Sequence, residues 1–418
     1  MMRSAVADRL ARLWVRPASR EDRNVRYLLA QTALAGVVQG GIVTFLPVFL
    51  ARLGASTLLV SLLTALPALV TIGLSLPAGL IVARWTRLVA TSARWYYLLR
   101  LTYLMVALAG LLAPPWGPLL IVLLWGLSAI PSTIANTAWY SVLAAAVAPE
   151  RRPVINGVRW ALLGLVSAGS VALFGEVLEA LPFPTGYVAV FLLSALAGFL
   201  NVWFYAHLEI DDPPPSAVTT PVARSARLAA LVAPLARRSP FRTYTVLTLL
   251  LRVGLFLPAG LYSVFWVRDL GASDAWIGWR TTVGNAALTL GYYLWGRYAS
   301  RSPHRRVLAL AGGGLGLYPL LTALTAPETL WLLLVAALVW GLCAAGVDVA
   351  LFEGLLQTTP ADERPRYVAL NTALANLVAF LAPILGAALA DGLGVRWALV
   401  VAGGCLLGTA ALAVRRSV

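Results

Sequence analysis

The sequence predicts an all-α membrane protein with about twelve transmembrane helices in two pseudo-symmetric six-helix bundles. Of its 418 residues, 60% are hydrophobic and only 12% are charged. Long apolar stretches recur along the chain, and landmarks of the first half return in the second. Soluble domains carry about 25% charged residues, whereas a spanning helix needs ~20 mostly apolar ones. Most of the chain is therefore expected to lie in a lipid bilayer.

The apolar stretches, taken in order, divide the chain into regions. The expected spans are 27–50, 57–83, 95–112, 119–141, 159–180 and 187–207, followed by 244–267, 275–298, 307–325, 329–356, 368–390 and 395–414. Residues 1–26 are read as a basic amphipathic segment, 27–207 and 243–418 as the two bundles, and 208–242 as a linker. The linker is marked by a run of three prolines, Pro213 to Pro215, which interrupts the membrane pattern.

The distribution of basic residues predicts the orientation. Most of the 32 basic residues lie in the terminal segments, the linker and every second loop. The opposite side holds only Arg52, Arg268, Arg280 and Arg396. Cytoplasmic loops carry the excess of basic residues, so both termini are expected in the cytoplasm of a multi-pass cell-membrane protein. Basic residues spread over short loops form no single polar face, which argues against nucleic-acid binding despite the net charge of +15.

Several landmarks occur twice, in the same order and at nearly the same spacing. Leu53-Gly54-Ala55-Ser56 returns as Leu270-Gly271-Ala272-Ser273, and the pair Gly79 and Arg84 returns as Gly296 and Arg301. The loop around Pro149 and Pro153 has a counterpart around Pro360 and Pro365. Because each half starts on the same side, the sequence predicts two duplicated halves in parallel.

These residues carry a family resemblance: over its whole length the chain resembles a major facilitator superfamily transporter. In that family the loop after the second helix typically reads Gly, three residues, Asp, Arg. Here Ala83 and Ser300 stand where the Asp is expected, although Gly79, Arg84, Gly296 and Arg301 are kept. The resemblance implies a cytoplasmic gate at these four residues and a central cavity lined by the first and fourth helices of each half.

Two ionisable side chains stand out within the predicted spans. An ionised group inside a membrane helix costs about 2.5–3.5 kcal/mol on insertion scales and is a functional hypothesis by default. Arg252 and Asp348 lie at similar depth and are expected to be electrostatic partners. The alternative is a fixed structural bridge. Arg252 also belongs to a helical stripe at spacings of three and four, composed of Thr245, Thr248, Arg252, Phe256, Ala259 and Ser263.

Polar residues of the first half complete the expected cavity. Asn136 is the repeat equivalent of Asp348 and lies on one face with Ser128, Ser132 and Tyr140. Gln39 is expected there because an amide in lipid must find a partner, with close helix packing as the alternative. Other charges are expected near the membrane surface: Arg100 and Glu353 would extend to it, and Arg280 would pair with Asp274 or with backbone.

The sequence favours a secondary transporter that moves a small organic solute by alternating access, with protons as the candidate coupling ion. A monomer is expected. The alternative is a non-cycling assembly or lipid-handling protein with the same fold, which the replaced Asp residues favour. No P-loop, metal-ligand cluster or nucleophile with its base is found in the sequence, so no cofactor and no enzyme activity are expected. The two cysteines, Cys343 and Cys405, both lie in apolar stretches, so a disulfide framework is not expected.

Overall fold

A computed structural model describes residues 19–212, 234–235, 239–360 and 363–415, and almost all of these are helical. The described part of the chain forms twelve long helical units. Ten of them are long and apolar enough to cross a membrane. The other two, Leu88–Ala109 and Asp274–Ala299, contain buried arginines, Arg100 and Arg280. The all-helical membrane fold expected from the sequence is confirmed.

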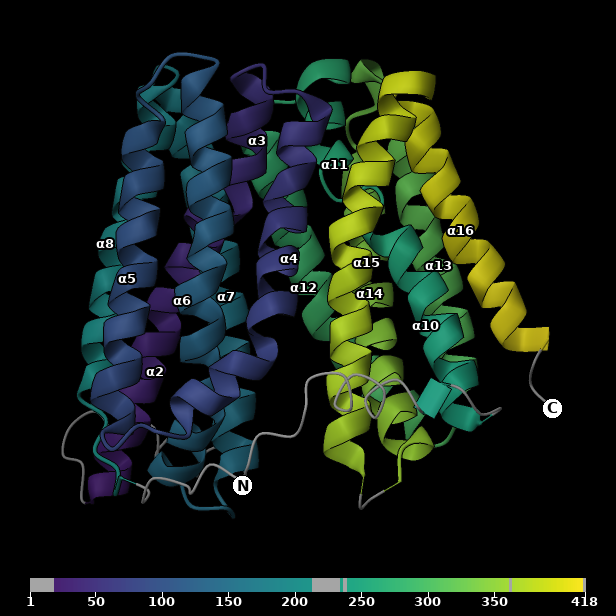
Figure 1. Ribbon diagram of the computed structural model, residues 1–418. Coiled ribbons are helices and arrows are strands. Elements are labelled where there is room, and N and C mark those ends of the chain that lie inside the picture. Colours follow the sequence, from purple (N-terminus) through teal and green to yellow (C-terminus); the bar gives the residue numbers. More distant parts are fainter. Residues whose placement is uncertain (1–18, 213–233, 236–238, 361–362, 416–418) are drawn as a thin grey trace, which may run out of the picture.

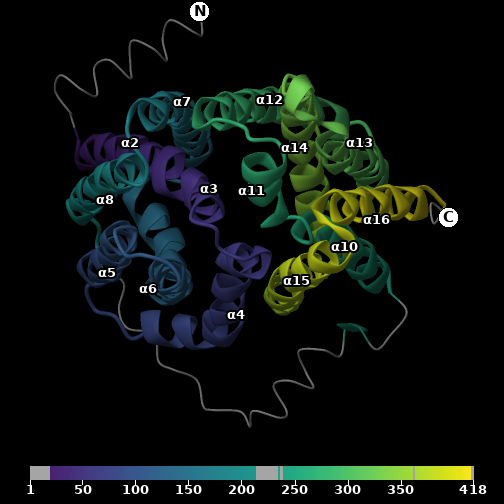
Figure 2. The same ribbon diagram turned by 90° about the horizontal axis from the view of Figure 1, so that it is seen from above.

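The helices form two bundles that lie side by side (Figure 1, Figure 2). The first bundle contains α2 Arg20–Val38, α3 Thr44–Arg52, α4 Thr57–Val82, α5 Leu88–Ala109, α6 Trp116–Ala146, α7 Arg152–Ala180 and α8 Thr185–Ala206. The second contains α10 Pro240–Phe256, α11 Leu261–Val264, α12 Asp274–Ala299, α13 His304–Leu324, α14 Leu332–Thr358, α15 Arg364–Leu393 and α16 Val395–Arg415. The helix α2 begins and α16 ends at the same end of the molecule, the lower end in Figure 1. We call it the terminal end and its opposite the distal end.

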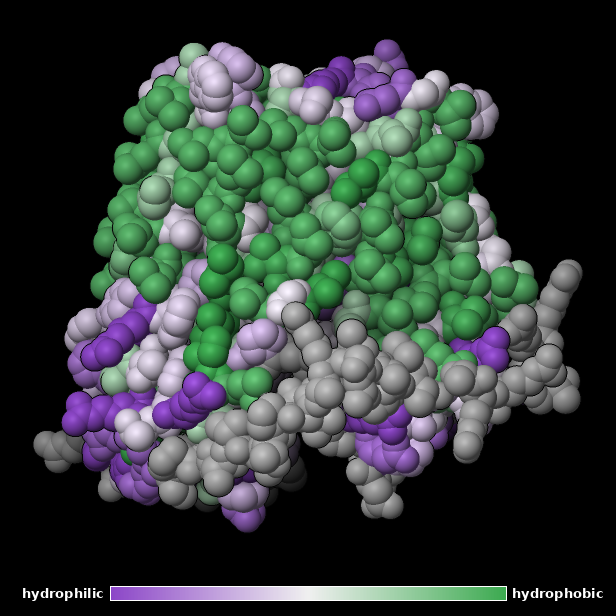
Figure 3. Space-filling view, in the orientation of Figure 1, coloured by the Kyte–Doolittle hydropathy of each residue, from purple (hydrophilic) through white to green (hydrophobic). Residues whose placement is uncertain are grey.

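The surface matches a protein in a bilayer. Figure 3 shows an apolar band around the middle of the molecule, with hydrophilic residues at the distal and terminal ends. Large apolar side chains such as Leu165, Leu173 and Trp160 are more than half exposed. Exposed apolar surface of this extent is unfavourable in water and favourable in lipid.

The first membrane helix starts earlier than expected, at Arg20 rather than at residue 27. Ser19 caps it by accepting from the Asp22 amide, and Arg23 binds Glu209 at 2.8 Å beyond the end of α8. The hydrogen bond from Arg23 lowers the pKa of Glu209. Exposed ion pairs contribute little individually, but this one fixes the start of the linker to the first bundle. Residues 1–18 of the predicted amphipathic segment and 213–233 of the linker lie outside the described residues.

The first helix of each bundle is interrupted near mid-depth. Residues Gln39–Val43 form a π-helical turn between α2 and α3. In the second bundle, residues 257–260 separate α10 from α11, and a π-helical turn follows at Phe265–Asp269. Short π-helical segments often occur at functional sites, and broken helices in transporters commonly border the binding site. The two interruptions therefore indicate where a site can form.

Close contact between helices depends on glycine at several points. A methyl group added to Gly341 on α14 would meet the carbonyl oxygen of Gly284 and the amide nitrogen of Leu288 at 2.7 Å, both backbone atoms of α12. Gly404 on α16 is instead exposed, and nothing lies within 4 Å of an added methyl group. These two glycines form a matched pair for testing the packing.

We expect Gly341→Ala to lower the thermal unfolding temperature of the detergent-purified protein, because overpacking typically costs ~1–3 kcal/mol. Gly404→Ala should leave it unchanged or raise it slightly, since Gly within a helix costs roughly 0.5–1 kcal/mol relative to Ala. Thermal unfolding followed by tryptophan fluorescence measures both variants. Equal unfolding temperatures for the two would contradict the close α12–α14 contact.

Candidate functional site

The two bundles are joined by a polar seal at the distal end. Arg52, the last residue of α3, binds Asp274 of α12 with Nη2 at 2.9 Å from Oδ1. The hydroxyl of Tyr187 on α8 donates to the same carboxylate oxygen. Asp274 is almost completely buried, so its charge is compensated inside the contact rather than by water. This interaction links both bundles through one carboxylate.

The repeated Leu-Gly-Ala-Ser motif provides the rest of the seal. Arg52 also donates to the carbonyl oxygen of Ala272 at 3.0 Å, and Arg268 donates to the carbonyl oxygen of Ala55. Ala55 and Ala272 occupy the same place in the two motifs, so each bundle donates an arginine to the motif of the other. The seal is thus reciprocal.

The glycine and serine on either side of each alanine set the backbone conformation that this contact needs. Gly54 and Gly271 have φ of +78° and +62°, a left-handed conformation that glycine adopts without steric cost. Ser56 and Ser273 then cap α4 and α12. The turn leaves the alanine carbonyl available to the arginine of the other bundle. The motif thus explains both the start of the helix and the contact across the bundles.

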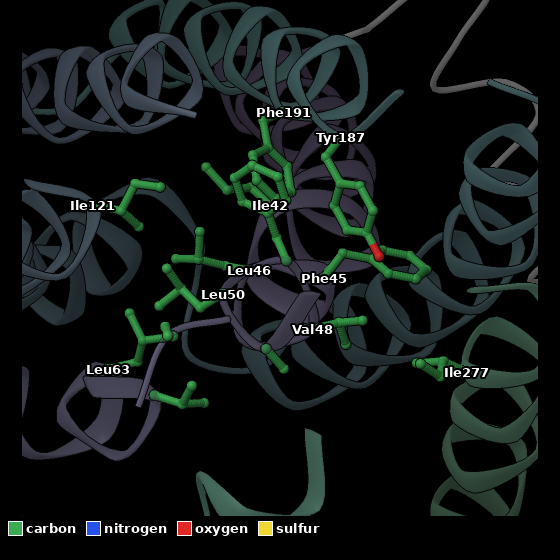
Figure 4. Close-up of a cluster of buried hydrophobic side chains, with 14 of the residues drawn as sticks. Ile42, Phe45, Leu46, Val48, Leu50, Leu63, Ile121, Tyr187, Phe191 and Ile277 are labelled. Atoms are coloured by element: carbon green, nitrogen blue, oxygen red, sulfur yellow. The ribbon is translucent and has the colours of Figure 1, made fainter. Parts of the chain in front are cut away.

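Apolar packing next to the seal also joins the two bundles. A single buried cluster at this end contains residues of both bundles, including Phe45, Leu50, Phe265 and Ile277. Figure 4 shows Ile277 beside the labelled residues of the first bundle. A cavity of about 690 Å³ lies at the seal and is bordered by residues of both bundles. The other large buried clusters each belong to one bundle.

The terminal end is different. In Figure 1 the helices α4 and α15 approach each other at the distal end and separate toward the terminal end. Gly79 and Gly296 have open space around them, with nothing within 4 Å of an added methyl group. Arg84 and Arg301 are exposed, and among the described residues neither makes a side-chain hydrogen bond or ion pair with the other bundle. The four predicted gate residues therefore make no such contact between the bundles in this structure.

Gln39 stands at the first helix interruption and is exposed at mid-depth. Behind it, a methyl group on Gly40 would meet Cβ of Ser170 on α7 at 2.7 Å, and one on Gly41 would meet the hydroxyl of Ser194 on α8. Close packing on one side of the π-helical turn leaves the Gln39 side exposed. Close helix packing therefore occurs at Gly40 and Gly41, while the cavity position expected for Gln39 stays a prediction.

The repeat-related residues Asn136 and Asp348 have similar surroundings. Both are exposed, although each lies within a long membrane helix. Asn136 accepts a hydrogen bond from the Tyr96 hydroxyl at 3.0 Å, and Asp348 accepts one from the Tyr292 hydroxyl at 2.7 Å. Exposed polar groups at this depth are unfavourable against lipid, so both are expected to face the space between the bundles.

Arg252 and Asp348 do not form a direct ion pair in this structure. Asp348 accepts a hydrogen bond from Tyr292. Among the described residues Arg252 forms no ion pair, and its Nε is buried without a hydrogen-bond partner. The charge of Asp348 still acts on Arg252 through space. The fixed structural bridge considered from the sequence is therefore not present here.

The predicted stripe on the seventh membrane helix is only partly exposed. Thr245 and Thr248 are buried against neighbouring helices, because α10 packs on α15 and α16 with this face. Arg252 and Phe256 are half-buried. In the first bundle Ser128 is also buried, whereas Tyr140 is exposed. Helical spacing places residues on one face but does not say which neighbour covers it.

Two buried arginines were misjudged from the sequence. Arg100 does not extend to the membrane surface: α5 begins at Leu88, so Arg100 lies more than three turns inside, bonded to Asn201. Arg280 does not pair with Asp274, which Arg52 occupies; it donates to the Tyr318 hydroxyl at 2.7 Å. The expected position of Arg100 followed from an error of seven residues in the start of its helix.

Comparisons with known proteins agree with this architecture. The family model described as Major Facilitator Superfamily matches residues 244–417. The structure is similar to that of the nucleoside transporter NupG, with a TM-score of 0.70, 13% identity, and coverage of 94% of this chain and 98% of that one. No curated protein matches the chain.

Two further solved structures have the same fold. A bacterial homologue of the iron transporter ferroportin, in an inward-facing state, gives a TM-score of 0.71 at 14% identity, covering 94% of this chain and 98% of that one. A POT family transporter in complex with 5-aminolevulinic acid gives 0.70 at 12% identity, covering 94% and 96%. Identities this low establish the fold and leave the solute open.

We expect Asp274→Asn to loosen the distal seal, because the half-buried Arg52 guanidinium loses its ionic partner. With Cys343 and Cys405 replaced by serine, a cysteine at Ser61, which is buried against Gly260 across the bundles, reports on opening. A bulky maleimide should label Ser61→Cys at least tenfold faster in the Asp274→Asn variant, a difference of about 1.4 kcal/mol. Asp391→Asn, an exposed acid at the same end, is the control. Identical labelling rates in both variants would refute the role of Asp274.

Proposed function

We propose that this chain, which has the fold of the Major Facilitator Superfamily and matches that superfamily over its C-terminal half, is a secondary transporter of a small organic solute. It moves the solute across the cytoplasmic membrane by alternating access. The solute binds between the two bundles, and the bundles rock about that site. We take both termini to be cytoplasmic, as the arginine distribution predicts, so in this proposal the closed distal end faces outward.

The asymmetry between the two ends is the observation that carries this proposal. The distal end is closed by polar contacts between the bundles, centred on Arg52, Asp274 and Arg268, together with an apolar cluster that both bundles share. Among the described residues, the gate residues at the terminal end make no such contacts. One closed end and one end without contacts between the gate residues is the arrangement that alternating access predicts for a single state of the cycle.

Asp348 is the candidate proton carrier. Its carboxylate is exposed between the bundles, accepts from Tyr292 of α12 and lies within electrostatic reach of Arg252 on α10. Protonation removes the negative charge and leaves Arg252 as the local charge, so the site attracts an anionic group more strongly. Proton binding and solute binding are thereby coupled.

Counterflow in proteoliposomes tests transport itself. Proteoliposomes loaded with unlabelled solute should accumulate the same solute in labelled form. The solutes to test first are nucleosides, peptides and organic acids. A non-cycling assembly or lipid-handling protein would show no counterflow with any of them. Absence of counterflow together with normal folding would favour that alternative function.

Asp348→Asn should abolish the pH-dependent accumulation of solute and retain solute exchange, because exchange requires no net proton movement. The measurement is uptake and exchange in proteoliposomes with and without a pH gradient. Asn136→Asp, at the repeat-related position, is the matched comparison. A wild-type pH profile in Asp348→Asn would exclude Asp348 as the carrier.

Cysteines at Ala83 and Ser300 should crosslink between the bundles only when the terminal end closes. Crosslinking in the cysteine-free background should therefore be weak in the present state and increase at least severalfold in the Asp274→Asn variant, whose distal seal is weakened. The yield is measured by gel mobility after proteolysis in the linker. Equal yields in both backgrounds would contradict alternation between the two ends.

A further inference from the structure

A small aromatic cavity lies in the second bundle, separate from the distal seal. Its volume is about 230 Å³. Four aromatic residues, Tyr262, Trp266, Tyr318 and Trp340, line it together with Arg280. The lining residues come from four successive parts of the chain: the region from Ala259 to Trp266, and the helices α12, α13 and α14. Figure 2 shows α11 beside α3 and α14, near the middle of the molecule.

Arg280 gives this cavity a positive charge without a carboxylate partner. Arg280 is only 8% exposed, and its guanidinium lies over the Trp266 ring at 4.2 Å. It donates a hydrogen bond to the neutral hydroxyl of Tyr318. Within the described part of the chain no carboxylate lies within ion-pair distance of Arg280, and Asp274 is bound to Arg52 instead. A buried cation without an anionic partner is unfavourable.

Two residues that line the cavity carry buried donors without an acceptor. Among the described residues, Nε of Arg280 and Nε1 of Trp266 have no hydrogen-bond partner, and Trp266 is 6% exposed. Unpaired buried donors are rare in native proteins and require an explanation. Both residues line the same cavity, which makes it the place to look for a bound group with acceptor oxygens.

We propose that this cavity binds the carboxylate end of an aromatic or apolar organic acid. A planar carboxylate fits the guanidinium, which donates from a rigid fork. The flat body of the ligand would pack against the rings of Tyr262 and Trp340. The volume is below the ~300–1,000 Å³ of sites that enclose a drug-sized ligand, so the cavity holds one end of a larger molecule.

The binding of an acid in this cavity does not depend on the proposed transport function. Only the identification of that acid with the transported solute rests on it. The position of the cavity supports this. It includes Ala259 and Ser263, at the break in the seventh membrane helix, and Arg252 precedes the same break.

Binding of benzoate and 2-naphthoate to the full-length detergent-purified protein tests the proposal. Isothermal titration should show saturable binding of both acids and at least tenfold weaker binding of benzamide and 2-naphthamide, which have the same shape without the charge. Inorganic phosphate is the control for non-specific anion binding. Equal affinity for acids and amides, no saturable binding of either acid, or competition of phosphate at equal concentration would overturn the proposal.

Variants locate the site. Arg280→Gln should weaken 2-naphthoate binding at least tenfold, and Arg280→Lys should weaken it less, because it keeps the charge and loses the planar fork. Arg242→Gln removes an exposed arginine at the start of α10 and should have no effect. If Arg280→Gln does not fold, the comparison of Arg280→Lys with wild type decides. Unchanged affinity in that variant and in a Trp340→Ala variant would place the acid elsewhere and refute the cavity.

The outcomes for binding and for transport can be told apart. Saturable 2-naphthoate binding lost in the Arg280 variants, without counterflow of any solute, supports the cavity and contradicts the transporter. Counterflow that is insensitive to 2-naphthoate and to Arg280→Lys supports the transporter and overturns the cavity. Inhibition of counterflow by 2-naphthoate in wild type, but not in Arg280→Lys, supports both.

Discussion

The reciprocal contact between the repeated motifs is the constraint on which the arrangement of the two bundles depends. Arg52 reaches the carbonyl of Ala272, and Arg268 reaches that of Ala55. Each carbonyl is presented by a left-handed glycine turn that also begins the next helix. Because both bundles carry the same motif, one local structure serves both sides of the contact. Asp274 adds an ion pair with Arg52. This ion pair joins the end of α3 to the start of α12 at a place where water is largely excluded.

This contact lies at one end of an interface that continues along α7 and α12, where Thr282 donates to the carbonyl oxygen of Ala168. The apolar cluster beneath it contains residues of both bundles, whereas the clusters toward the terminal end belong to one bundle each. The interrupted first helix of each bundle lies between the two regions. Polar residues such as Gln39, Asn136 and Asp348 are exposed at this depth. A sealed end, broken helices and polar mid-depth residues are the parts that alternating access requires.

The charges inside the second bundle differ in how they are compensated. Asp274 is compensated by Arg52, while Arg252 and Arg280 have buried Nε atoms without acceptors. Asp348 is bound by a tyrosine rather than by an arginine. Among the described residues, the second bundle therefore has unpaired donors on α10 and on α12. In the proposed anion cavity, an anionic solute would supply an acceptor for Arg280.

The sequence by itself determined the membrane class, the two halves and most helix positions, because lipid imposes a length and an apolar composition that are read directly from the chain. It also identified the repeated motif, but not what Arg52 and Arg268 do with it, since a donor and its acceptor lie more than 200 residues apart. The depth of Arg100 was misjudged because polar residues at the start of α5 hid the beginning of the helix. Only the tertiary structure decided that Asp274 pairs with Arg52, that Thr245 and Thr248 are buried, and that Arg280 faces four aromatic rings. Helical periodicity fixes the face of a residue, whereas its partner is chosen by which helix packs against that face.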